Sequence, residues 1–302
     1  MPTRKLTGKA PPFAVNKKAV IILAVVSSSV SADLVRLANA PSLILVFYRV
    51  LFAVLLMLPV VAVKNRKELL SLDKKTTLLC MLSGVFHGLH FVAFFEGLRY
   101  TSIASATILT STEVFYVALA LVFIFKEKLA PAAWLGIGAA FAGSAVIALS
   151  DSGGAGGGSV LKGDLLALLG GLLMAFYTLL GRTCRRSVSS NAYNFLVYLS
   201  AVVTVGLIAL AVKLPFTGYG PVTLLCALGM TVFCTLLGHS LFNWGLKFVQ
   251  ASYISNAKLL SPVFATVIGI FLFGEYPSLW VVLGSALIII GVAVYSNQIS
   301  GQ

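Results

Sequence analysis

Charged side chains are scarce in this sequence, and their scarcity excludes a soluble globular fold. Only 10% of the 302 residues are charged, and only 9 residues are acidic, whereas a soluble domain carries about 25% charged residues. Apolar residues make up 59% of the chain, and the mean hydropathy is +1.00. A chain of this composition needs the lipid bilayer as its solvent, so the sequence predicts a membrane protein.

Motifs for catalysis, nucleotide binding and metal binding are also absent. The sequence contains no HExxH, no GxSxG, no paired aspartates and no GxxxxGK[ST] loop. We therefore expect neither an enzyme nor direct coupling to ATP hydrolysis. The cysteines lack metal-ligand spacing, and we interpret them as small packing residues; they are Cys80, Cys184, Cys226 and Cys234. We expect no cofactor and no metal ion.

The chain instead contains ten apolar runs separated by short gaps. They span residues 19–38, 42–63, 76–98, 102–125, 131–150, 162–182, 190–213, 221–248, 251–274 and 277–297. Each run is long enough for a helix to cross about 30 Å of hydrocarbon at about 1.5 Å per residue. None alternates in polarity as a membrane-spanning strand does. The sequence thus predicts an all-α polytopic membrane protein with ten transmembrane helices.

Basic residues are distributed unequally between the two ends of these runs. If the N-terminus is cytoplasmic, sixteen lysines and arginines fall on the cytoplasmic side and only Arg99, Lys162 and Lys213 on the other. This bias predicts a multi-pass protein of the cytoplasmic (inner) membrane with both termini in the cytoplasm. It also accounts for the net charge of +13, so nucleic acid is not an expected partner.

The two halves of the sequence repeat one another at an offset of 148 residues. Gly97-Leu98-Arg99-Tyr100 matches Gly245-Leu246-Lys247-Phe248. Further matches at this offset are Lys126-Glu127 with Gly274-Glu275, Gly136 with Gly284, and Gly143 with Gly291. Because the repeated unit holds five apolar runs, an odd number, the second copy must enter the membrane inverted. Inverted repeats are the architecture of alternating-access carriers, whose substrate site lies near the midplane where the copies meet.

This repeat predicts five parts of the chain. They are a cytoplasmic N-terminal segment (1–18), the first repeat (19–150), a linker (151–161), the second repeat (162–297) and a cytoplasmic tail (298–302). The linker, DSGGAGGGSVL, is glycine-rich and is expected to be flexible and extracytoplasmic. The first apolar run follows basic residues and contains Ser27–Ser29, as a signal peptide does. We expect it to be retained, because it completes the first repeat.

Longer motifs recur in order along both halves. They are LVRLANAPSLILVFYRVLFA (34–53), GLRYTSIASATILTS (97–111), FKEKLAP (125–131), GDLLALLGGLLMAFYTLLGR (163–182), GLKFVQASYISNAKLLSPVF (245–264) and FGEYPSLWVVLG (273–284). Their order resembles that of EamA-type members of the drug/metabolite transporter superfamily, over nearly the whole chain after residue 18. The resemblance implies ten helices in two inverted five-helix repeats and, mostly, export of metabolites or amino acids. The chain departs from the family pattern at Thr112-Glu113, where its second copy has Ser261-Pro262.

Ionisable side chains inside the apolar runs are the main candidate functional residues. A buried charge costs at least about 2.5–3.5 kcal/mol at the centre of a spanning helix, so such residues suggest function. They are Asp33, Arg36, Arg49, His87, His90, Glu113 and Lys258. Asp33 and Arg36 share one helix face, where they either pair with each other or line a central cavity. Arg36 and Arg49 would clamp a carboxylate or phosphate, unless Asp33 and Glu113 neutralise them.

The other ionisable residues also leave alternatives open. Glu113 is a proton-coupling group, a site for a substrate ammonium or a static partner of an arginine; Asp33 is a second ion-coupling candidate. Lys258 either extends its ammonium to the membrane interface or contacts an anion in the cavity. His87 and His90 lie on one helix face and are expected to line the cavity. The isolated His239 is more typical of a packing residue.

Aromatic side chains complete the predicted substrate-binding set. Tyr116, Tyr177 and Trp244 are candidates to stack on a substrate or to cage a cation, with lipid contact or packing as the alternative for each. The repeated glycines at 136, 143, 284 and 291 are expected to form helix-packing seams, and a homodimer is their alternative use.

Acidic and basic groups nearly balance inside the apolar runs. We therefore expect a secondary carrier that exports a small polar or zwitterionic, amino-acid-like metabolite by alternating access. The alternative is a proton-coupled importer or exporter of an amine or a quaternary ammonium compound. A small-molecule substrate and the lipid bilayer are the expected partners.

Overall fold

The computed structural model describes residues 17–126, 130–150, 159–249, 251–274 and 276–300. Most of the predicted segment 1–18 and linker 151–161, and the last two residues of the predicted tail, lie outside these ranges. Residues 298–300 of that tail continue the last helix. Within the described ranges the regular secondary structure is helical, as the sequence predicts.

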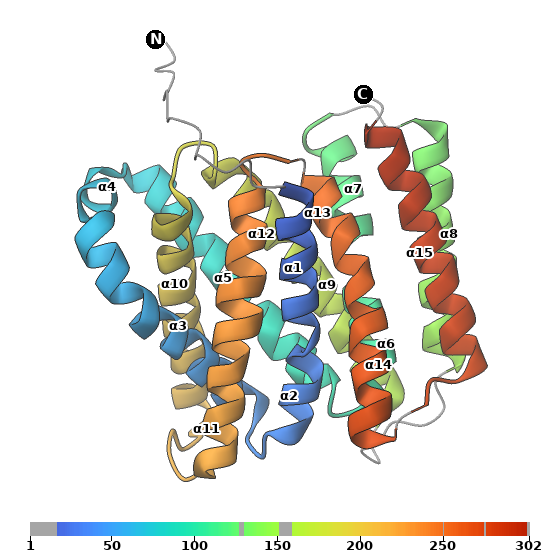
Figure 1. Cartoon of the computed structure of the whole chain (residues 1–302), viewed down its shortest axis with the longest axis horizontal. Coiled ribbons are helices and arrows are strands. Elements are labelled where there is room, and N and C mark those ends of the chain that lie inside the picture. Colours follow the sequence, from blue (N-terminus) through green and yellow to red (C-terminus); the bar gives the residue numbers. More distant parts are fainter. Residues whose placement is uncertain (1–16, 127–129, 151–158, 250, 275, 301–302) are drawn as a thin grey trace.

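The helices lie side by side in one bundle, with the start of α1 and the end of α15 at the same edge (Figure 1). In chain order they are α1 (Lys17–Ser29), α2 (Ser31–Leu37), α3 (Ser42–Lys64), α4 (Arg66–Ser71), α5 (Lys74–Gly97), α6 (Ile103–Thr110), α7 (Glu113–Phe123), α8 (Pro131–Ser150), α9 (Val160–Cys184), α10 (Ser190–Ala211), α11 (Gly220–Gly229), the π-helix η1 (Met230–His239), α12 (Ser240–Gly245), α13 (Ala251–Ala257), the 3-10 turn η2 (Lys258–Leu260), α14 (Ser261–Phe273) and α15 (Leu279–Ser300). We call the edge where α1 starts the cation-rich end, and the opposite edge the cation-poor end.

Seven of the ten predicted crossings are long and apolar enough to span a membrane, judged over the described residues. They are Ala19–Leu37, Ser42–Lys64, Lys74–Gly97, Ile103–Phe123, Val160–Cys184, Ser190–Ala211 and Gly220–Gly245. The other three predicted runs correspond to α8, to α15 and to the broken run α13–η2–α14. Shorter apolar stretches of α8 and α15, Pro131–Gly143 and Leu279–Gly291, meet the composition but not the length of a span.

Three predicted runs are interrupted near their middle, although the sequence analysis treats them as continuous. The breaks fall at Val30, at Ser111–Thr112 and at Lys258–Leu260. Hydroxyl groups explain the first two, because they compete with backbone amides for helix carbonyls. Ser29 Oγ donates to Val25 O (2.8 Å), and Thr112 Oγ1 donates to Leu109 O (2.6 Å). At the third break, Pro262 occupies the first turn of α14, where its missing N–H is tolerated.

Helices from the two halves pack on one another in matched pairs. α3 packs on α10 and α8 on α15, while α6 contacts α14 and α7 contacts α13. The contact of α5 with α9 has its counterpart in the contact of η1 with α1. At the offset of 148 residues, each pairing maps onto itself or onto another observed pairing. The contacts therefore fit a two-repeat architecture.

The seam between α8 and α15 is formed by the repeated glycines, as predicted. A Cβ on Gly143 would lie 2.5 Å from the carbonyl oxygen of Gly284, and a Cβ on Gly291 would meet the carbonyl oxygen of Gly136. The earlier residue of α8 faces the later residue of α15, so the two helices run antiparallel. Small residues at such positions let the two backbones touch.

Gly143→Ala is expected to lower the free energy of unfolding by about 1–3 kcal/mol, because its Cβ would overpack this seam. The matched control is Gly138→Ala on the same helix, since no atom lies within 4 Å of a Cβ there. Alanine at position 138 should instead stabilise the helix by up to about 1 kcal/mol relative to glycine. Thermal unfolding in detergent measures both variants. Equal melting temperatures would mean that α8 and α15 do not pack through Gly143.

At the cation-rich end, Glu68 on α4 connects the first half of the chain to the second. Its Oε1 accepts the backbone N–H of Ser189 (2.6 Å), and its Oε2 accepts the Ser189 hydroxyl (2.5 Å) and Asn65 Nδ2 (2.9 Å). Partial burial raises the pKa of Glu68, but the hydrogen bonds from Ser189 and Asn65 outweigh it and hold the pKa below its usual value. The ionised carboxylate therefore stabilises the contact between α4 and the start of α10.

The stability that Glu68 contributes should depend on pH. Because its folded pKa is depressed, the contribution is present above the unfolded pKa of about 4.3 and is lost as the pH falls through the folded pKa. Glu68→Gln should therefore melt below the wild-type protein at pH 7, and the difference should close toward pH 3. A melting-temperature difference that is constant over this range would exclude the ionised carboxylate as its cause.

Candidate functional site

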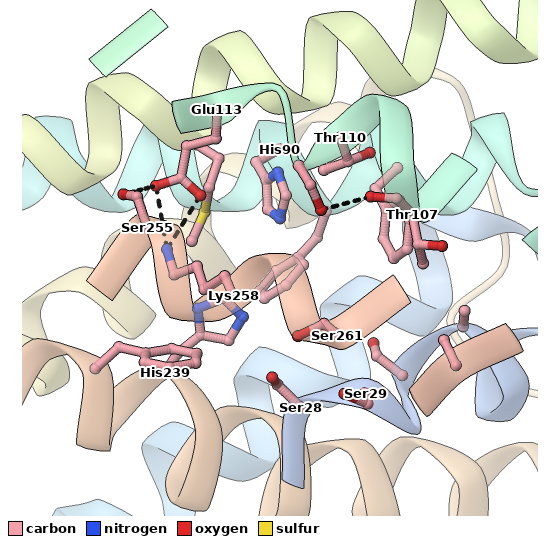
Figure 2. Close-up of a pocket in the computed structure, with 18 of the residues that line it drawn as sticks. Ser28, Ser29, His90, Thr107, Thr110, Glu113, His239, Ser255, Lys258 and Ser261 are labelled. Atoms are coloured by element: carbon pink, nitrogen blue, oxygen red, sulfur yellow. Dashed lines mark hydrogen bonds and ion pairs between the residues drawn. The ribbon is translucent and has the colours of Figure 1, made fainter. Parts of the chain in front are cut away.

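A central cavity of about 110 Å³ lies where the interrupted helices meet. It is lined by Ser28, Ser29, Ser31, Ala32, Arg49, His90, Phe91, Phe94, Thr107, Thr110, Ser111, Glu113, Met174, His239, Phe242, Ser255, Lys258, Ser261 and Ala265. These residues flank all three helix breaks and the end of the π-helix η1. Both halves of the chain contribute, and Figure 2 shows Ser28 and Ser29 across the cavity from Glu113 and Thr110.

Arg49 is a fully buried cation on α3, with no exposed surface. Its Nε donates to Thr235 Oγ1 (2.8 Å) on η1, and its Nη1 donates to Ser31 Oγ (2.9 Å) on α2. The guanidinium lies 3.9 Å from the centre of the Phe91 ring. In the part of the chain that the structure describes, Nη2 has no hydrogen-bond partner and Arg49 forms no ion pair. The arrangement thus holds a positive charge rigidly beside the cavity without neutralising it.

Glu113 and Lys258 form an ion pair across the cavity between the two halves. Lys258 Nζ lies 3.1 Å from both carboxylate oxygens of Glu113. Thr178 (2.7 Å) and Ser255 (3.1 Å) donate their hydroxyls to Glu113 Oε1. Figure 2 shows Lys258 reaching toward Glu113 from the broken run α13–η2–α14. The ammonium of Lys258 therefore points to a carboxylate inside the bundle instead of reaching the membrane interface, and the partner of Glu113 is a lysine instead of an arginine.

The three histidines of the chain gather beside this cavity. The ring of His87 lies 4.7 Å from that of His239 and 6.2 Å from that of His90. His90 and His239 line the cavity, and His90 Nδ1 is hydrogen-bonded to Gly170 O (2.8 Å). His87 lies behind them, stacked on Tyr177 at 4.2 Å. His90 therefore lies at the cavity, where it is expected, whereas His87, expected beside it, does not line it; His239 does line it, although an isolated histidine is more typical of packing.

The structure separates Arg36 from Arg49. Arg36 Nη2 donates to Thr101 O (2.7 Å), and its side chain lines a second cavity nearer the cation-poor end. Asp33 is buried on α2 and lies beside α14, with its Oδ1 3.8 Å from a Cβ built on Gly269. The predicted clamp of two arginines is therefore not formed at the central cavity. Arg36 lies about one helical turn beyond Ala32, which lines this cavity.

The predicted aromatic residues do not line the central cavity. Tyr177 is buried directly behind His87, where its hydroxyl accepts a hydrogen bond from Asn243 Nδ2 (2.6 Å). Tyr116 is half-buried on α7 and packs edge-on against Phe115 at 5.8 Å. Trp244 packs against Phe248 at 4.7 Å, near the cation-rich end of α12. The aromatic wall of the cavity comes instead from Phe91, Phe94 and Phe242.

Hydroxyl groups are the part of the site that the sequence analysis missed. Eight serines and threonines line the cavity, namely Ser28, Ser29, Ser31, Thr107, Thr110, Ser111, Ser255 and Ser261. The sequence does contain a pattern that could have indicated them, because these serines and threonines occur as short clusters or spaced pairs inside otherwise apolar runs. At the offset of 148 residues, Thr107 matches Ser255, and each lies within one turn of a helix break.

This arrangement offers a solute both signs of charge in a small polar space. A carboxylate or phosphate can accept hydrogen bonds from Arg49, and an ammonium can compete with Lys258 for Glu113. Hydroxyls on both sides can donate or accept further hydrogen bonds. Groups that could hold a metal ion through three His, Cys, Asp or Glu ligands were not found among the described residues.

Comparison with known proteins finds one family model that matches both halves of the chain. Residues 18–149 and 161–297 each match the model of the EamA-like transporter family. The chain is similar to an uncharacterized transporter of Clostridium kluyveri (25% identity, 82% of this chain and 81% of that one) and to the uncharacterized transporter YxxF of Bacillus subtilis (26% identity, 85% and 81%). A solved crystal structure has the same fold, with a TM-score of 0.67 and 18% identity over 93% of this chain and 96% of that one.

Lys258→Met is expected to destabilise the protein by about 3 kcal/mol, because it leaves the Glu113 carboxylate buried without its cation. The double variant Glu113→Gln with Lys258→Met should regain most of that loss, since neither charge is then unpaired. Unfolding of the wild-type protein, both single variants and the double variant completes the cycle. Additive losses in the double variant would show that the two side chains do not interact.

Proposed function

The chain belongs to the EamA-like transporter family, and on this premise we propose that it is a secondary carrier for a small polar or zwitterionic, amino-acid-like metabolite. It exports its substrate across the cytoplasmic membrane by alternating access. Ten helices form two inverted five-helix repeats, 19–150 and 162–297, joined by an extracytoplasmic linker. Both termini lie in the cytoplasm. The two repeats rock about the central cavity, which is accessible from one side at a time.

The antiparallel seam of α8 and α15 supports the inverted arrangement. In two copies related by inversion, equivalent helices must run in opposite directions. Gly143 lies against Gly284, and Gly136 lies against Gly291. Exchanging the repeats turns one contact into the other, because the offset of 148 takes Gly143 to Gly291 and Gly284 back to Gly136, as a two-fold axis in the membrane plane requires. The start of α1 and the C-terminal end of α15 lie at the same edge of the bundle, which is what an even number of crossings requires (Figure 1).

The observation that carries the proposed function is the unneutralised Arg49 beside the Glu113–Lys258 pair. A buried guanidinium without a counter-ion is costly, so the site is suited to a solute that brings a carboxylate to Arg49. The ammonium of the same solute can share Glu113 with Lys258. A cavity of about 110 Å³ has room for several water-sized groups, so it suits a small solute.

We assign the site accordingly. Arg49 binds the anionic group, Glu113 and Lys258 bind the opposite end, and His90 and the surrounding hydroxyls orient the solute. His87 and Tyr177 support His90 and His239 from behind. Asp33 and Glu113 are the proposed ion-coupling carboxylates. Arg36, Tyr116 and Trp244 are not part of this central site.

One observation favours the alternative, a proton-coupled carrier of an amine or a quaternary ammonium compound. Phe91, Phe94 and Phe242 line the cavity near Glu113, and aromatic faces with a carboxylate can cage a cation. The positive charge of Arg49 opposes this use, since the lining carries two cations and one carboxylate.

Counterflow in proteoliposomes tests the two functions directly. Vesicles loaded with unlabelled solute should accumulate the same labelled amino acid at both of two imposed proton gradients. Labelled choline serves as the quaternary ammonium probe in parallel vesicles. Exchange of choline without exchange of any amino acid would overturn the proposed substrate class.

Arg49→Ala should abolish counterflow while leaving expression and the melting temperature close to wild type, because no carboxylate in the described structure depends on it. Arg49→Lys keeps the charge but loses the forked geometry, so we expect transport with a half-saturation concentration raised about tenfold. An unfolded Arg49→Ala protein would instead make Arg49 a structural residue.

A further inference from the structure

A basic surface covers the connection between α3 and α5 at the cation-rich end. This connection contains the short helix α4, and Figure 1 places it at an outer corner of the edge where α1 starts. Its exposed cations are Lys64, Arg66, Lys67, Lys74 and Lys75. We call residues 63–75 the α4 basic surface, since α4 and its flanking residues supply all of these cations.

The α4 basic surface has a net charge of +3, because it holds five cations and two carboxylates. The carboxylate of Glu68 is engaged by Ser189 and Asn65. Asp73 caps α5, since its Oδ1 accepts the backbone N–H of Thr76 (3.0 Å) and its Oδ2 accepts the Thr76 hydroxyl (2.7 Å). In the described parts of the chain, the side chains of the five cations make neither hydrogen bonds nor ion pairs. Their charge is therefore available to an anion from outside the protein.

The same surface exposes apolar side chains between its cations. Leu69 and Leu72 turn toward the bundle and pack against its buried core. Leu70, in contrast, is 77% exposed, and Val63 is 83% exposed. Helices that combine basic residues with exposed apolar side chains lie at the boundary between lipid headgroups and acyl chains. In that position the apolar side chains reach the acyl chains, while the cations stay at the level of the phosphates.

The position of the surface along the chain fits such a boundary. Ser42–Lys64 and Lys74–Gly97 are both long and apolar enough to span a membrane. Lys64 ends the first of these segments, and Lys74 begins the second. The α4 basic surface therefore joins two spanning helices on one side of the bilayer, where lipid headgroups surround it. Clusters of about four to eight cations next to a spanning helix are typical of anionic-lipid binding.

We propose that the α4 basic surface binds anionic phospholipids, with Arg66 and Lys67 on their phosphates and Leu70 against their acyl chains. This inference does not depend on which solute the protein transports. A soluble phosphate would use the cations alone and leave Leu70 and Val63 in water, so the exposed apolar side chains favour a lipid. A phospholipid with a zwitterionic headgroup brings no net charge to the cations, so the surface selects anionic headgroups.

A fluorophore on α4 measures lipid binding at this surface. Ser71→Cys places a thiol at an exposed position of α4, and the four native cysteines are all buried. The protein, labelled with an environment-sensitive dye, is reconstituted into phosphatidylcholine vesicles that contain increasing fractions of phosphatidylglycerol with the same acyl chains. The fluorescence should change and saturate as the phosphatidylglycerol fraction rises. A signal that does not depend on this fraction would overturn the proposal, and this result needs no charge variant.

Charge variants of the labelled protein make the result specific. Arg66→Gln with Lys67→Gln should raise the half-saturating phosphatidylglycerol fraction about tenfold, because each cation beside an anionic surface contributes about fivefold in affinity. The matched control is Lys17→Gln with Lys247→Gln, two exposed cations at the same end of the bundle outside α4. It should change the half-saturating fraction by less than about twofold. Equal shifts in the two double variants would mean that only the overall charge of this end matters, and would overturn a surface specific to α4.

Two further measurements separate a lipid from a soluble anion. Glycerol 3-phosphate added to pure phosphatidylcholine vesicles should leave the fluorescence unchanged, and a signal equal to that of phosphatidylglycerol would mean that the surface binds a soluble phosphate. A nitroxide on Leu70→Cys should collide more often with oxygen, and less often with a water-soluble nickel chelate, than a nitroxide on Ser71→Cys, because position 70 enters the bilayer. Equal accessibility at the two positions would place Leu70 in water and overturn the proposal.

Discussion

The burial of the Arg49 guanidinium is the constraint on which the rest of the site depends. A cation this deep in an apolar bundle costs several kcal/mol unless its donors are satisfied and its charge is balanced. Ser31 and Thr235 satisfy two of its nitrogens, and Phe91 covers one face. These partners come from α2, η1 and α5, so three elements hold the guanidinium in place. The charge balance is left to the solute, which makes Arg49 a binding group.

The interrupted helices follow from the same physics. Within a bilayer, irregular backbone is tolerated only where it is buried in protein or lines a cavity. Here the breaks at Val30, Ser111–Thr112 and Lys258–Leu260 all border the central cavity. α9 covers one of them closely, since a Cβ on Gly171 would lie 2.7 Å from Thr110 O. The freed polar groups and the nearby hydroxyls thus form the wall of the site, and Glu113 and Lys258 join the two halves across it.

The sequence predicted the helical class, the family and the packing seam. The first two depend on hydropathy and motif order over many residues, and the seam depends on the repeated glycines. It also selected Arg49, His90, Glu113 and Lys258 as candidates, which the structure places at the central cavity, since ionisable residues stand out in apolar runs. It could not predict that Arg36 lies one turn outside the central cavity, or that Lys258 pairs with Glu113 from a segment 145 residues away. Periodicity carries no information on such contacts. The sequence does not assign the serines at 28, 29 and 31 to the site, because a hydroxyl in a membrane helix has several local uses and only the fold distinguishes them.

The most direct test of this account is a structure determined with an amino acid bound. The account predicts the solute carboxylate within hydrogen-bond distance of Arg49 Nη2 and its ammonium next to Glu113, between the helix breaks of both halves. A bound solute that leaves Arg49 Nη2 without a contact, or a protein carboxylate occupying that position, would contradict it.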